Sequence, residues 1–495
     1  MPSVPCSQHV ADFLEYIDAS PTAFHAVHQA ESRLEEAGFI RLRERDSWSS
    51  NVCPGGKYYV IRNASTIVAF AIGKKWRPGN PLAIIGTHSD SCNLRLKPTS
   101  KREANGFLQF GVETYGSGLW HTWFDRDLGV AGRVMCSTDK GVETKLVHIH
   151  KAICKIPSLA VHFGNSVPFE FNNETHLLPI AGLVKPGEEK AQEAGAGTAE
   201  KLTPDAPFRS LKKLDSRHQP RLLNLVAEQI GVAESAIEDF DLSLFDVQKA
   251  SIGGLDDELI FSARLDNLAM TYCAVRALID SVKARADSLD NETAVRMFGA
   301  FDHEEVGSNS AQGANGSIVL DIIQRLSEMG VGHEHSSSTA FIRSMAASFF
   351  VSADMTHSVN PNYSDKHESE HRSLINKGTV IKINANQNYA TSSSGIVLMQ
   401  DIAQRAKRTA ADPRTQGNGV PLQLEVARND CSGGSTIGPQ IAAKTGIRTL
   451  DLGNAQLSMH SIRETTGVLD IENAINLFQS YYDHYSEVEH AVFAD

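Results

Sequence analysis

Two adjacent glutamates, Glu304 and Glu305, follow an apolar run at residues 294–300 that predicts a buried strand. Carboxylates at the exit of a buried strand are costly to bury unless a positive charge compensates them. A metal ion would supply that charge, with one glutamate acting as a ligand while its neighbour remains free to move protons. Considered alone, the motif is also explained by a solvated turn after an ordinary strand.

Four other positions, at the ends of predicted strands or in the loops beside them, carry side chains that bind metals. They are His88, Asp266, Asp354 and His460. Each has an ordinary alternative when it is considered singly, such as a loop histidine for His88 or a helix N-cap for Asp266. Asp90 lies two residues after His88, where its carboxylate can hold the imidazole in the tautomer that binds a metal.

Taken together with Glu305, these four side chains form a ligand set of two histidines and three carboxylates, one of which can bridge two cations. A set of nitrogen and oxygen ligands without cysteine suits zinc, with manganese or cobalt as alternatives. Paired cations about 3.5–4 Å apart activate a water molecule and polarise a carbonyl group. Glu304 would then accept the proton of the water and deliver it to the leaving amine.

The elements that must position these residues alternate between strand and helix. Apolar residues at helical spacing predict helices near the start of the chain and directly after Asp266. Short apolar runs predict strands at residues 58–61, 66–72, 82–85, 294–300, 348–353, 379–384 and 449–452. Alternation of this kind predicts a mostly parallel sheet with helices on both faces, an α/β/α fold. Ligands bind at the carboxyl ends of strands in such sheets, where the candidate residues lie.

The texture of the sequence changes after Pro98. Alternating segments at residues 146–150 and 159–162 predict half-exposed strands. Residues 185–207 contain almost no large apolar side chain, which predicts a mobile loop. We therefore expect a β-rich domain inserted into a catalytic domain. The predicted ranges are 1–98 and 251–495 for the catalytic domain and 99–250 for the inserted domain.

The composition is that of an ordinary soluble globular protein, with 41% hydrophobic and 21% charged residues in 495. A net charge of -12 without a basic block argues against binding to nucleic acid. Seven scattered cysteines without a C-x-x-C pair favour a reducing compartment. We expect a cytoplasmic location, with the vacuole left open, because neither a secretory signal nor a membrane-spanning run is evident.

Six motifs, in order along nearly the whole chain, resemble those of the aspartyl aminopeptidases, which are dizinc exopeptidases. They lie at residues 86–91, 264–267, 302–308, 353–357, 434–439 and 459–464. By this resemblance, His88, Asp266 and Asp354 hold one zinc ion. Asp266, Glu305 and His460 then hold the second zinc ion. Glu304 is the general base of the family, and Asp90 orients His88.

The resemblance also implies an activity and an assembly. Its members release N-terminal aspartate or glutamate from peptides, and they form tetrahedral homododecamers. The inserted domain makes the dimer contact in these assemblies. A catalytically silent protein of the same fold, used as a shell or carried as cargo, is the competing hypothesis at this point.

Recognition of an acidic substrate requires a cation in the pocket. Lys382 lies in the strand pattern at 379–384, where its ammonium group could pair with a substrate carboxylate. A lysine that extends along an exposed face fits the same pattern equally well. The resemblance favours the substrate role for Lys382. It also implies that His162 reaches the site of a neighbouring subunit. His357 and Tyr389 are further candidates for substrate binding.

Residues 367–371 match H-E-x-x-H, the zinc-binding helix of many metalloproteases. That chemistry needs a third protein ligand, and no His, Asp or Glu follows between His371 and Asp401. We therefore expect a solvated loop near the site. The Gly-Gly-Ser run at 433–435 lacks the spacing of a nucleophile elbow and is expected to open a helix.

Overall fold

The structure is a computed structural model that describes residues 7–49, 51–163, 169–185, 214–283, 286–329, 338–407, 409, 419–431 and 433–492. It divides into two compact units, one up to Ser91 and again from Ala250, the other Cys92–Lys249. The boundary predicted after Pro98 falls inside strand β5 (Asn93–Ala104), because that strand already belongs to the second unit. Apart from Lys185, the loop predicted at 185–207 lies outside the described residues.

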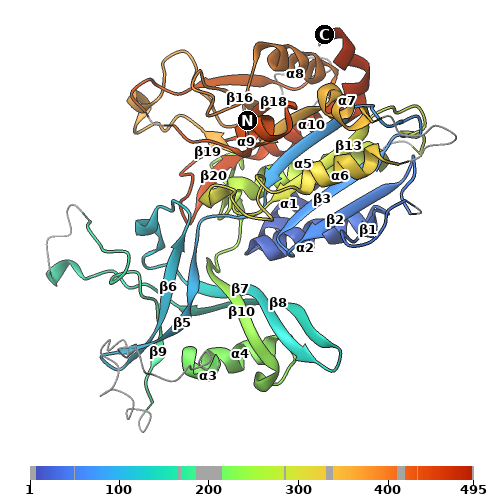
Figure 1. The fold of residues 1–495 in the computed structure, drawn as a ribbon. Helices are drawn as coiled ribbons and strands as arrows, with labels where there is room; N and C mark the ends of the chain where they lie inside the picture. Colours follow the sequence, from blue (N-terminus) through green and yellow to red (C-terminus); the bar gives the residue numbers. More distant parts are fainter. Residues whose placement is uncertain are drawn as a thin grey trace, which may run out of the picture. The chain divides into compact units, whose positions relative to one another are not determined.

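A sheet of nine described strands forms the centre of the first unit (Figure 1). Its order is β1 (Ile40–Leu42), β2 (Lys57–Arg62), β3 (Thr66–Ile72), β13 (Val295–Phe301), β4 (Leu82–His88), β14 (Phe349–Ala353), β18 (Arg448–Gly453), β16 (Thr379–Ile383) and β17 (Leu422–Val426). Strands β13, β4, β14 and β18 run parallel to one another. The β2–β3, β3–β13 and β16–β18 pairs are antiparallel. The expected α/β class is confirmed, with a mixed sheet around a parallel centre.

The buried side chains of the strands alternate between two apolar clusters, one on each face of this sheet. Helices cover both faces. In β3, Val68 belongs to one cluster, whereas Ile67 and Ala69 belong to the other. The cluster that contains Ile67 is covered by α1 (Gln8–Asp18), α2 (Ala23–Glu36), α5 (Leu265–Lys283), α8 (Ser393–Arg405) and α10 (Val468–Val492). The cluster that contains Val68 is covered by α6 (Ile318–Ser327), α7 (Ala340–Ala347) and α9 (Ile437–Thr445).

The parallel register brings the ends of the central strands to one edge of the sheet. His88 at the end of β4 lies opposite Phe301 at the end of β13. The turn that carries Glu304 and Glu305 therefore begins beside His88. Ala353 of β14 lies opposite Leu452 of β18, so Asp354 leaves the sheet at the same edge.

A second, smaller sheet of the first unit positions the remaining ligands. Its order is β11 (Ser251–Gly253), β12 (Leu259–Ser262), β20 (Glu464–Gly467), β19 (Ala455–Leu457) and β15 (Thr356–His357). Asp266 follows the end of β12, and His460 lies in the loop between β19 and β20. These strands have four residues or fewer, and all except β12 lack the runs of apolar residues that predicted the larger sheet.

The second unit contains an antiparallel sheet of six described strands. Its order is β8 (Gly141–Cys154), β7 (Leu128–Thr138), β10 (Ile237–Asp246), β5, β6 (Phe107–Tyr115) and β9 (Ile180–Leu183), with α3 (Leu214–Arg217) and α4 (Pro220–Ile230). The strand predicted at 159–162 is wrong, because Val161–Phe163 form a short 3-10 helix, η2. The apolar side chains there are exposed instead of packed on the sheet, so their alternation reflects no strand.

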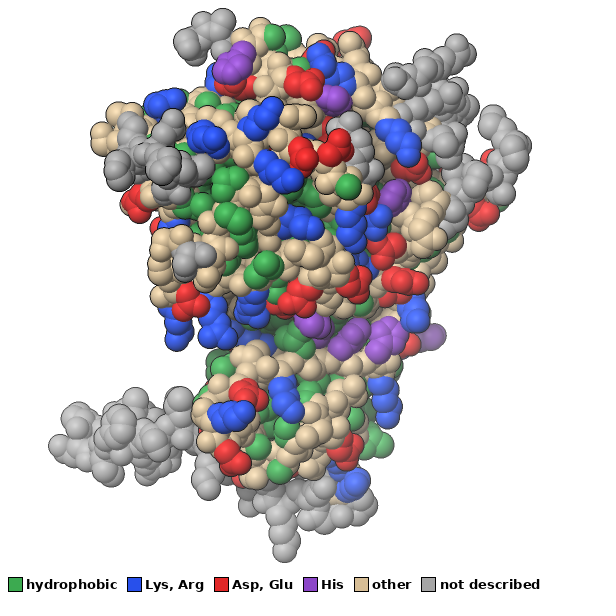
Figure 2. Space-filling model, turned by 90° about the vertical axis from the view of Figure 1, so that its right-hand side faces the viewer, with side chains coloured by type: hydrophobic (Ala, Val, Ile, Leu, Met, Phe, Trp, Pro, Cys, Tyr) green, Lys and Arg blue, Asp and Glu red, His purple; other side chains and the backbone are tan. Residues whose placement is uncertain are grey.

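Acidic and basic side chains are interspersed on the face of the molecule drawn in Figure 2. A mixed surface of this kind presents no uniform field to a charged polymer on that face. None of the helices in the described ranges is long and apolar enough to span a bilayer.

Candidate metal centre

His88 is the centre of the first candidate metal position and is 2% exposed. Its Nε2 lies 3.3 Å from Oδ1 of Asp266 and 3.5 Å from Oδ1 of Asp354. One ligand atom from each of these three residues lies within 4.8 Å of the others. A single cation can therefore be reached by all three side chains.

His460 forms a second candidate position on the other side of Asp266. Its Nε2 lies 3.3 Å from Oδ2 of Asp266 and 3.3 Å from Oε2 of Glu305. Asp266 thus presents one carboxylate oxygen to each histidine, as a bridging ligand between two cations does. The structure brings together all five side chains that the sequence analysis proposed as ligands.

Asp90 connects His88 to the two glutamates. Nδ1 of His88 lies 3.3 Å from Oδ1 of Asp90 and 3.0 Å from the backbone oxygen of the same residue. The carboxylate of Asp90 also accepts the backbone N–H of Glu304 at 3.2 Å and that of Glu305 at 3.1 Å. The sequence did not predict that Asp90 holds the backbone of the two glutamates.

The backbone near the candidate ligands adopts an unusual conformation. Arg264 (φ 57°), His303 (φ 65°) and His460 (φ 65°) lie in the left-handed region. Non-glycine residues adopt positive φ at a cost and keep it only where the surroundings enforce it. Each of these residues is itself a candidate ligand or lies within two residues of one, so the turns that aim the ligands are held in place by their packing.

Burial and mutual proximity shift the pKa values of these groups. Burial alone would raise the pKa of Asp266, but His460 and His88 outweigh burial and hold that pKa below its usual value. Burial raises the pKa of Glu305 to about 7, and the charge of Asp266 adds to the effect. Burial also raises the pKa of Glu304 well above its usual value. Without a cation, protons must supply part of the positive charge that this cluster needs.

The donor set fits zinc. Zinc binds imidazole nitrogen and carboxylate oxygen. Both imidazoles of this site lie beside the carboxylate of Asp266. Apart from the approach of Nε2 of His88, Oδ1 of Asp266 has no hydrogen-bond partner among the described residues. Buried polar atoms are nearly always satisfied, so a cation is the natural partner of this oxygen.

Lys382 is 3% exposed, so the alternative of a lysine on an exposed face is wrong. Its Nζ donates a hydrogen bond to the backbone oxygen of Met355 at 2.6 Å, one residue beyond Asp354. Nζ also lies 5.4 Å from the centre of the Tyr389 ring. Burial alone would lower the pKa of Lys382, but the combined charges of Asp354, Tyr389, Glu425 and Asp451 outweigh burial and raise it, so the ammonium group stays charged.

His357 is exposed at the end of β15 and lines a cavity of about 490 Å³ together with His367 and Glu425. The H-E-x-x-H segment lies in this cavity wall as a loop and not as a helix, as predicted. Glu368 accepts the backbone N–H of His371 at 2.9 Å and lies 2.7 Å from its Nδ1. The run at 433–435 precedes α9, which confirms the expected helix opening.

His162 is an exposed residue of η2 in the second unit. Its proposed reach into a neighbouring subunit's site stays a prediction. Sequence reasoning missed Glu464, which is 2% exposed and accepts the backbone N–H groups of Asp266 and His460. The only signal available was its position at the end of the motif at 459–464.

The fold and this ligand set define a zinc-dependent metallopeptidase. Residues 16–482 match the family described as aminopeptidase I zinc metalloprotease (M18). The chain belongs to the M18 family and is a metalloaminopeptidase, as the sequence motifs indicated.

Relatives match over almost the full length of the chain. Aspartyl aminopeptidase of Aspergillus oryzae is 52% identical, with 99% of this chain and 98% of that protein covered. Aspartyl aminopeptidase 4 of Saccharomyces cerevisiae is 45% identical, with 99% and 97% covered. The cryo-EM structure of the Ape4 and Nbr1 complex gives a TM-score of 0.88 at 45% identity, over 100% of this chain and 90% of that one. The structure of the Saccharomyces cerevisiae mApe1 dodecamer gives 0.79 at 30% identity, over 97% and 98%.

Proposed function

We propose that this aminopeptidase removes N-terminal aspartate or glutamate from peptides by attack of an activated water molecule. The observation that carries the proposal is the buried ammonium group of Lys382. It is hydrogen-bonded to the backbone oxygen of Met355, the residue that follows the candidate ligand Asp354. Relatives that bear the name aspartyl aminopeptidase support the same specificity.

Two zinc ions per subunit are the proposed cofactors, with manganese or cobalt as alternatives in one position. His88, Asp266 and Asp354 would hold one ion. Asp266, Glu305 and His460 would hold the other. When bound, such ions supply the positive charge that activates a water and polarises the scissile carbonyl.

Glu304 is the proposed general base. Its Oε2 lies 3.8 Å from Nε2 of His88, and its side chain keeps 16% exposure, so it borders the centre and is open to substrate. A carboxylate at this position can accept the proton of a water and pass it to a leaving amine. Asp90 holds the backbone of Glu304 and so fixes the reach of this carboxylate.

Lys382 is the proposed partner of the acidic side chain of the substrate, because a buried cation favours a carboxylate over an apolar group. Tyr389 lies against the same ammonium group and would border the acidic pocket. His357 lines the neighbouring cavity and is proposed to contact the peptide. His162 is proposed to complete the site of a neighbouring subunit.

We further propose a homo-oligomer, specifically a tetrahedral dodecamer, in which the inserted domain makes the dimer contact. The dodecamer of a 30% identical relative supports this assembly. Leu159, Val161 and Phe163 of the second unit are 68%, 70% and 79% exposed, which suits an interface. A cytoplasmic location is proposed because the six cysteines of the described residues form no disulfide bond with one another. A vacuolar location is the alternative.

A panel of chromogenic aminoacyl substrates tests the activity. Aspartyl and glutamyl substrates should be cleaved faster than a leucyl substrate, and the opposite order would remove the acidic assignment. Metal analysis of the same preparation should give two cations per chain. A value well below two, together with no turnover, would favour the catalytically silent shell or cargo protein.

A further inference from the structure

We propose that Glu464 is a positioning residue that sets the separation of the two halves of the metal centre. It does so by holding the backbones of Asp266 and His460 with one carboxylate. This inference rests on the proposed function, because it requires a two-cation centre at these residues.

The carboxylate of Glu464 makes one contact with each of two separate loops. Its Oε2 accepts the backbone N–H of Asp266 at 3.0 Å. Its Oε1 accepts the backbone N–H of His460 at 2.9 Å, and Nε2 of Gln456 donates to the same oxygen at 3.3 Å. Because the side chain is 2% exposed, these bonds face little competition from solvent.

The topology of the smaller sheet explains why one side chain can reach both loops. Strand β20 pairs antiparallel with β12 on one side and with β19 on the other. Strands β12 and β19 therefore both end at the edge of the sheet where β20 begins. Asp266 follows the end of β12, His460 follows the end of β19, and Glu464 is the first residue of β20. The carboxylate lies between the two loops that carry these ligands.

Asp266 is already tied to the strands that carry the first metal position. Oγ of Ser91 donates to the backbone oxygen of Asp266 at 2.8 Å. Nδ2 of Asn267 donates to the backbone oxygen of Ala353 at 2.8 Å, beside Asp354. Glu464 adds a direct link from Asp266 to His460, so it connects the first metal position to the second.

The link between the two loops requires that both carboxylate oxygens of Glu464 accept hydrogen bonds. A glutamine at this position has the same length but only one carbonyl oxygen, and its amide group would face a backbone N–H. The loop of His460 or that of Asp266 would then lose its tether and move. Residues that orient metal ligands typically change metal affinity by about 10–100-fold when they are replaced.

Asp470 provides a matched control in the same unit. It is fully buried, and its carboxylate also joins two backbone N–H groups, those of Asn376 at 2.6 Å and Gly378 at 2.9 Å. These two residues precede β16, so Asp470→Asn removes a bond of the same kind without touching the loops that carry Asp266 and His460.

The experiment compares the full-length wild type with Glu464→Gln and Asp470→Asn. Zinc affinity is measured by competition with a chromogenic chelator, and kcat and KM are measured with an aspartyl substrate at limiting and excess zinc. Glu464→Gln should weaken the more loosely held zinc ion by about 10–100-fold. Its kcat should fall at limiting zinc and recover in excess zinc, with KM unchanged. Asp470→Asn should lower the melting temperature of the metal-free protein and leave zinc affinity unchanged.

Zinc affinity of Glu464→Gln equal to that of the wild type would overturn the proposal, and so would an equal loss in Asp470→Asn. If Glu464→Gln does not fold, Glu464→Asp is measured in the same way, because the shorter carboxylate cannot span both N–H groups. Failure of both variants to fold in excess zinc would assign Glu464 to folding alone. A wild type that binds fewer than two zinc ions contradicts the proposed metal centre itself, which separates the two failures.

Discussion

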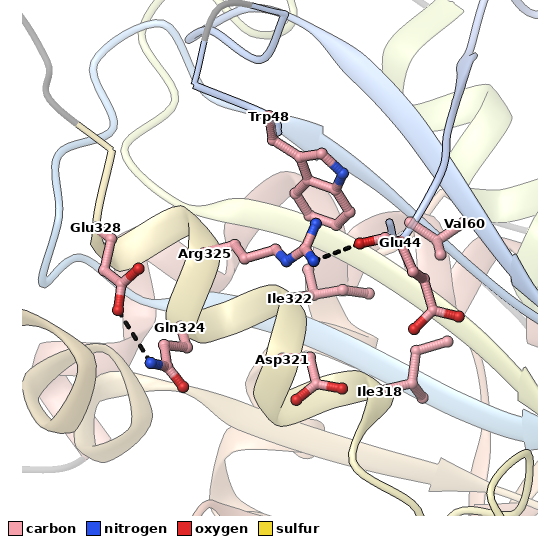
Figure 3. Close-up of a pocket in the computed structure, with 9 residues that line it drawn as sticks. All are labelled: Glu44, Trp48, Val60, Ile318, Asp321, Ile322, Gln324, Arg325 and Glu328. Carbon is pink, nitrogen blue, oxygen red and sulfur yellow. Dashed lines mark hydrogen bonds between the residues drawn. The ribbon is translucent and has the colours of Figure 1, made fainter. Parts of the chain in front are cut away.

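Two clusters of acidic side chains in the first unit have different basic partners that offset their negative charge. Glu44 and Asp321 share the guanidinium of Arg62, whose Nη2 contacts Oε2 of Glu44 and lies 3.0 Å from Oδ2 of Asp321. Beside them, the guanidinium carbon of Arg325 lies 4.5 Å from the centre of the Trp48 ring. Arg325 also donates a hydrogen bond to the backbone oxygen of Glu44. Glu44, Trp48, Asp321 and Arg325 line a cavity of about 430 Å³ along α6 (Figure 3).

The metal centre places imidazoles where the first cluster places guanidinium groups. His88 and His460 each face carboxylates at 3.3 Å, and Asp266 lies between them. A guanidinium is always charged and has no lone pair for a metal. A neutral imidazole leaves the carboxylates without a full counter-charge and offers a nitrogen ligand. The basic partner therefore decides whether an acidic cluster is a structural ion pair or a cation site.

The base at the metal centre gives the strongest test of this contrast. Glu304→Gln should retain metal and fold but lower kcat by about 10²–10⁴-fold, because the amide cannot accept the proton of the water. Steady-state kinetics with an aspartyl substrate and metal analysis of the same sample check this. Turnover close to that of the wild type would exclude Glu304 as the base.

Substitution of the buried Lys382 tests whether this cation binds the substrate or only stabilises the fold. Lys382→Ala should lower kcat/KM for aspartyl substrates by about 10–100-fold, the value of a charged hydrogen bond, and affect leucyl substrates much less. Parallel assays of both substrates measure the ratio. Equal losses on the two substrates would contradict a role for Lys382 in selectivity.

The metal-free centre should respond to pH, because protons replace the missing cation. The folded state holds the proton of Glu305 up to a pKa of about 7, whereas the unfolded chain releases it near the ordinary value of 4.5. Between these values the folded state binds more protons, so its free energy of unfolding falls as pH rises, by at most about 1.4 kcal/mol per pH unit. Denaturant titrations of metal-free protein measure this slope. Glu305→Gln should flatten it, and an unchanged slope in that variant would assign the effect to other groups.

The smallest effect is expected at the guanidinium cluster. Arg62→Met should lower the free energy of unfolding by about 0.5–1 kcal/mol, because Glu44 and Asp321 are 35% and 46% exposed and water screens their repulsion. Denaturant unfolding of the zinc-loaded protein measures the change. Zinc content and kcat should stay unchanged, and loss of either would show that the two clusters are not independent.

The main sheet could be predicted because its strands are short runs of buried apolar residues. The predicted run at 66–72 matches β3, and the runs at 294–300 and 348–353 match β13 and β14 to within one residue. The ends of the predicted runs at 82–85, 294–300 and 348–353 placed His88, Glu304 and Asp354 at one edge of the sheet.

Other features depend on contacts that a single sequence does not reveal. The burial of Lys382 follows from the neighbours of β16 in the sheet, which the strand pattern at 379–384 does not specify. Strands β19 and β20 are too short and polar to produce a periodic signal, so the position of Glu464 was invisible. The pairing of Arg62 with Asp321 joins residues far apart in the chain and has no local signature.

One consequence follows from the two backbone bonds of Asp90. Because the same carboxylate contacts His88 and anchors both Glu304 and Glu305, a change at this position is felt by base and ligands at once. Energetic effects of substitutions at these residues should therefore be non-additive. Adaptive exchanges at any one of these positions would depend on the amino acids present at the others, so their evolution is expected to be epistatic.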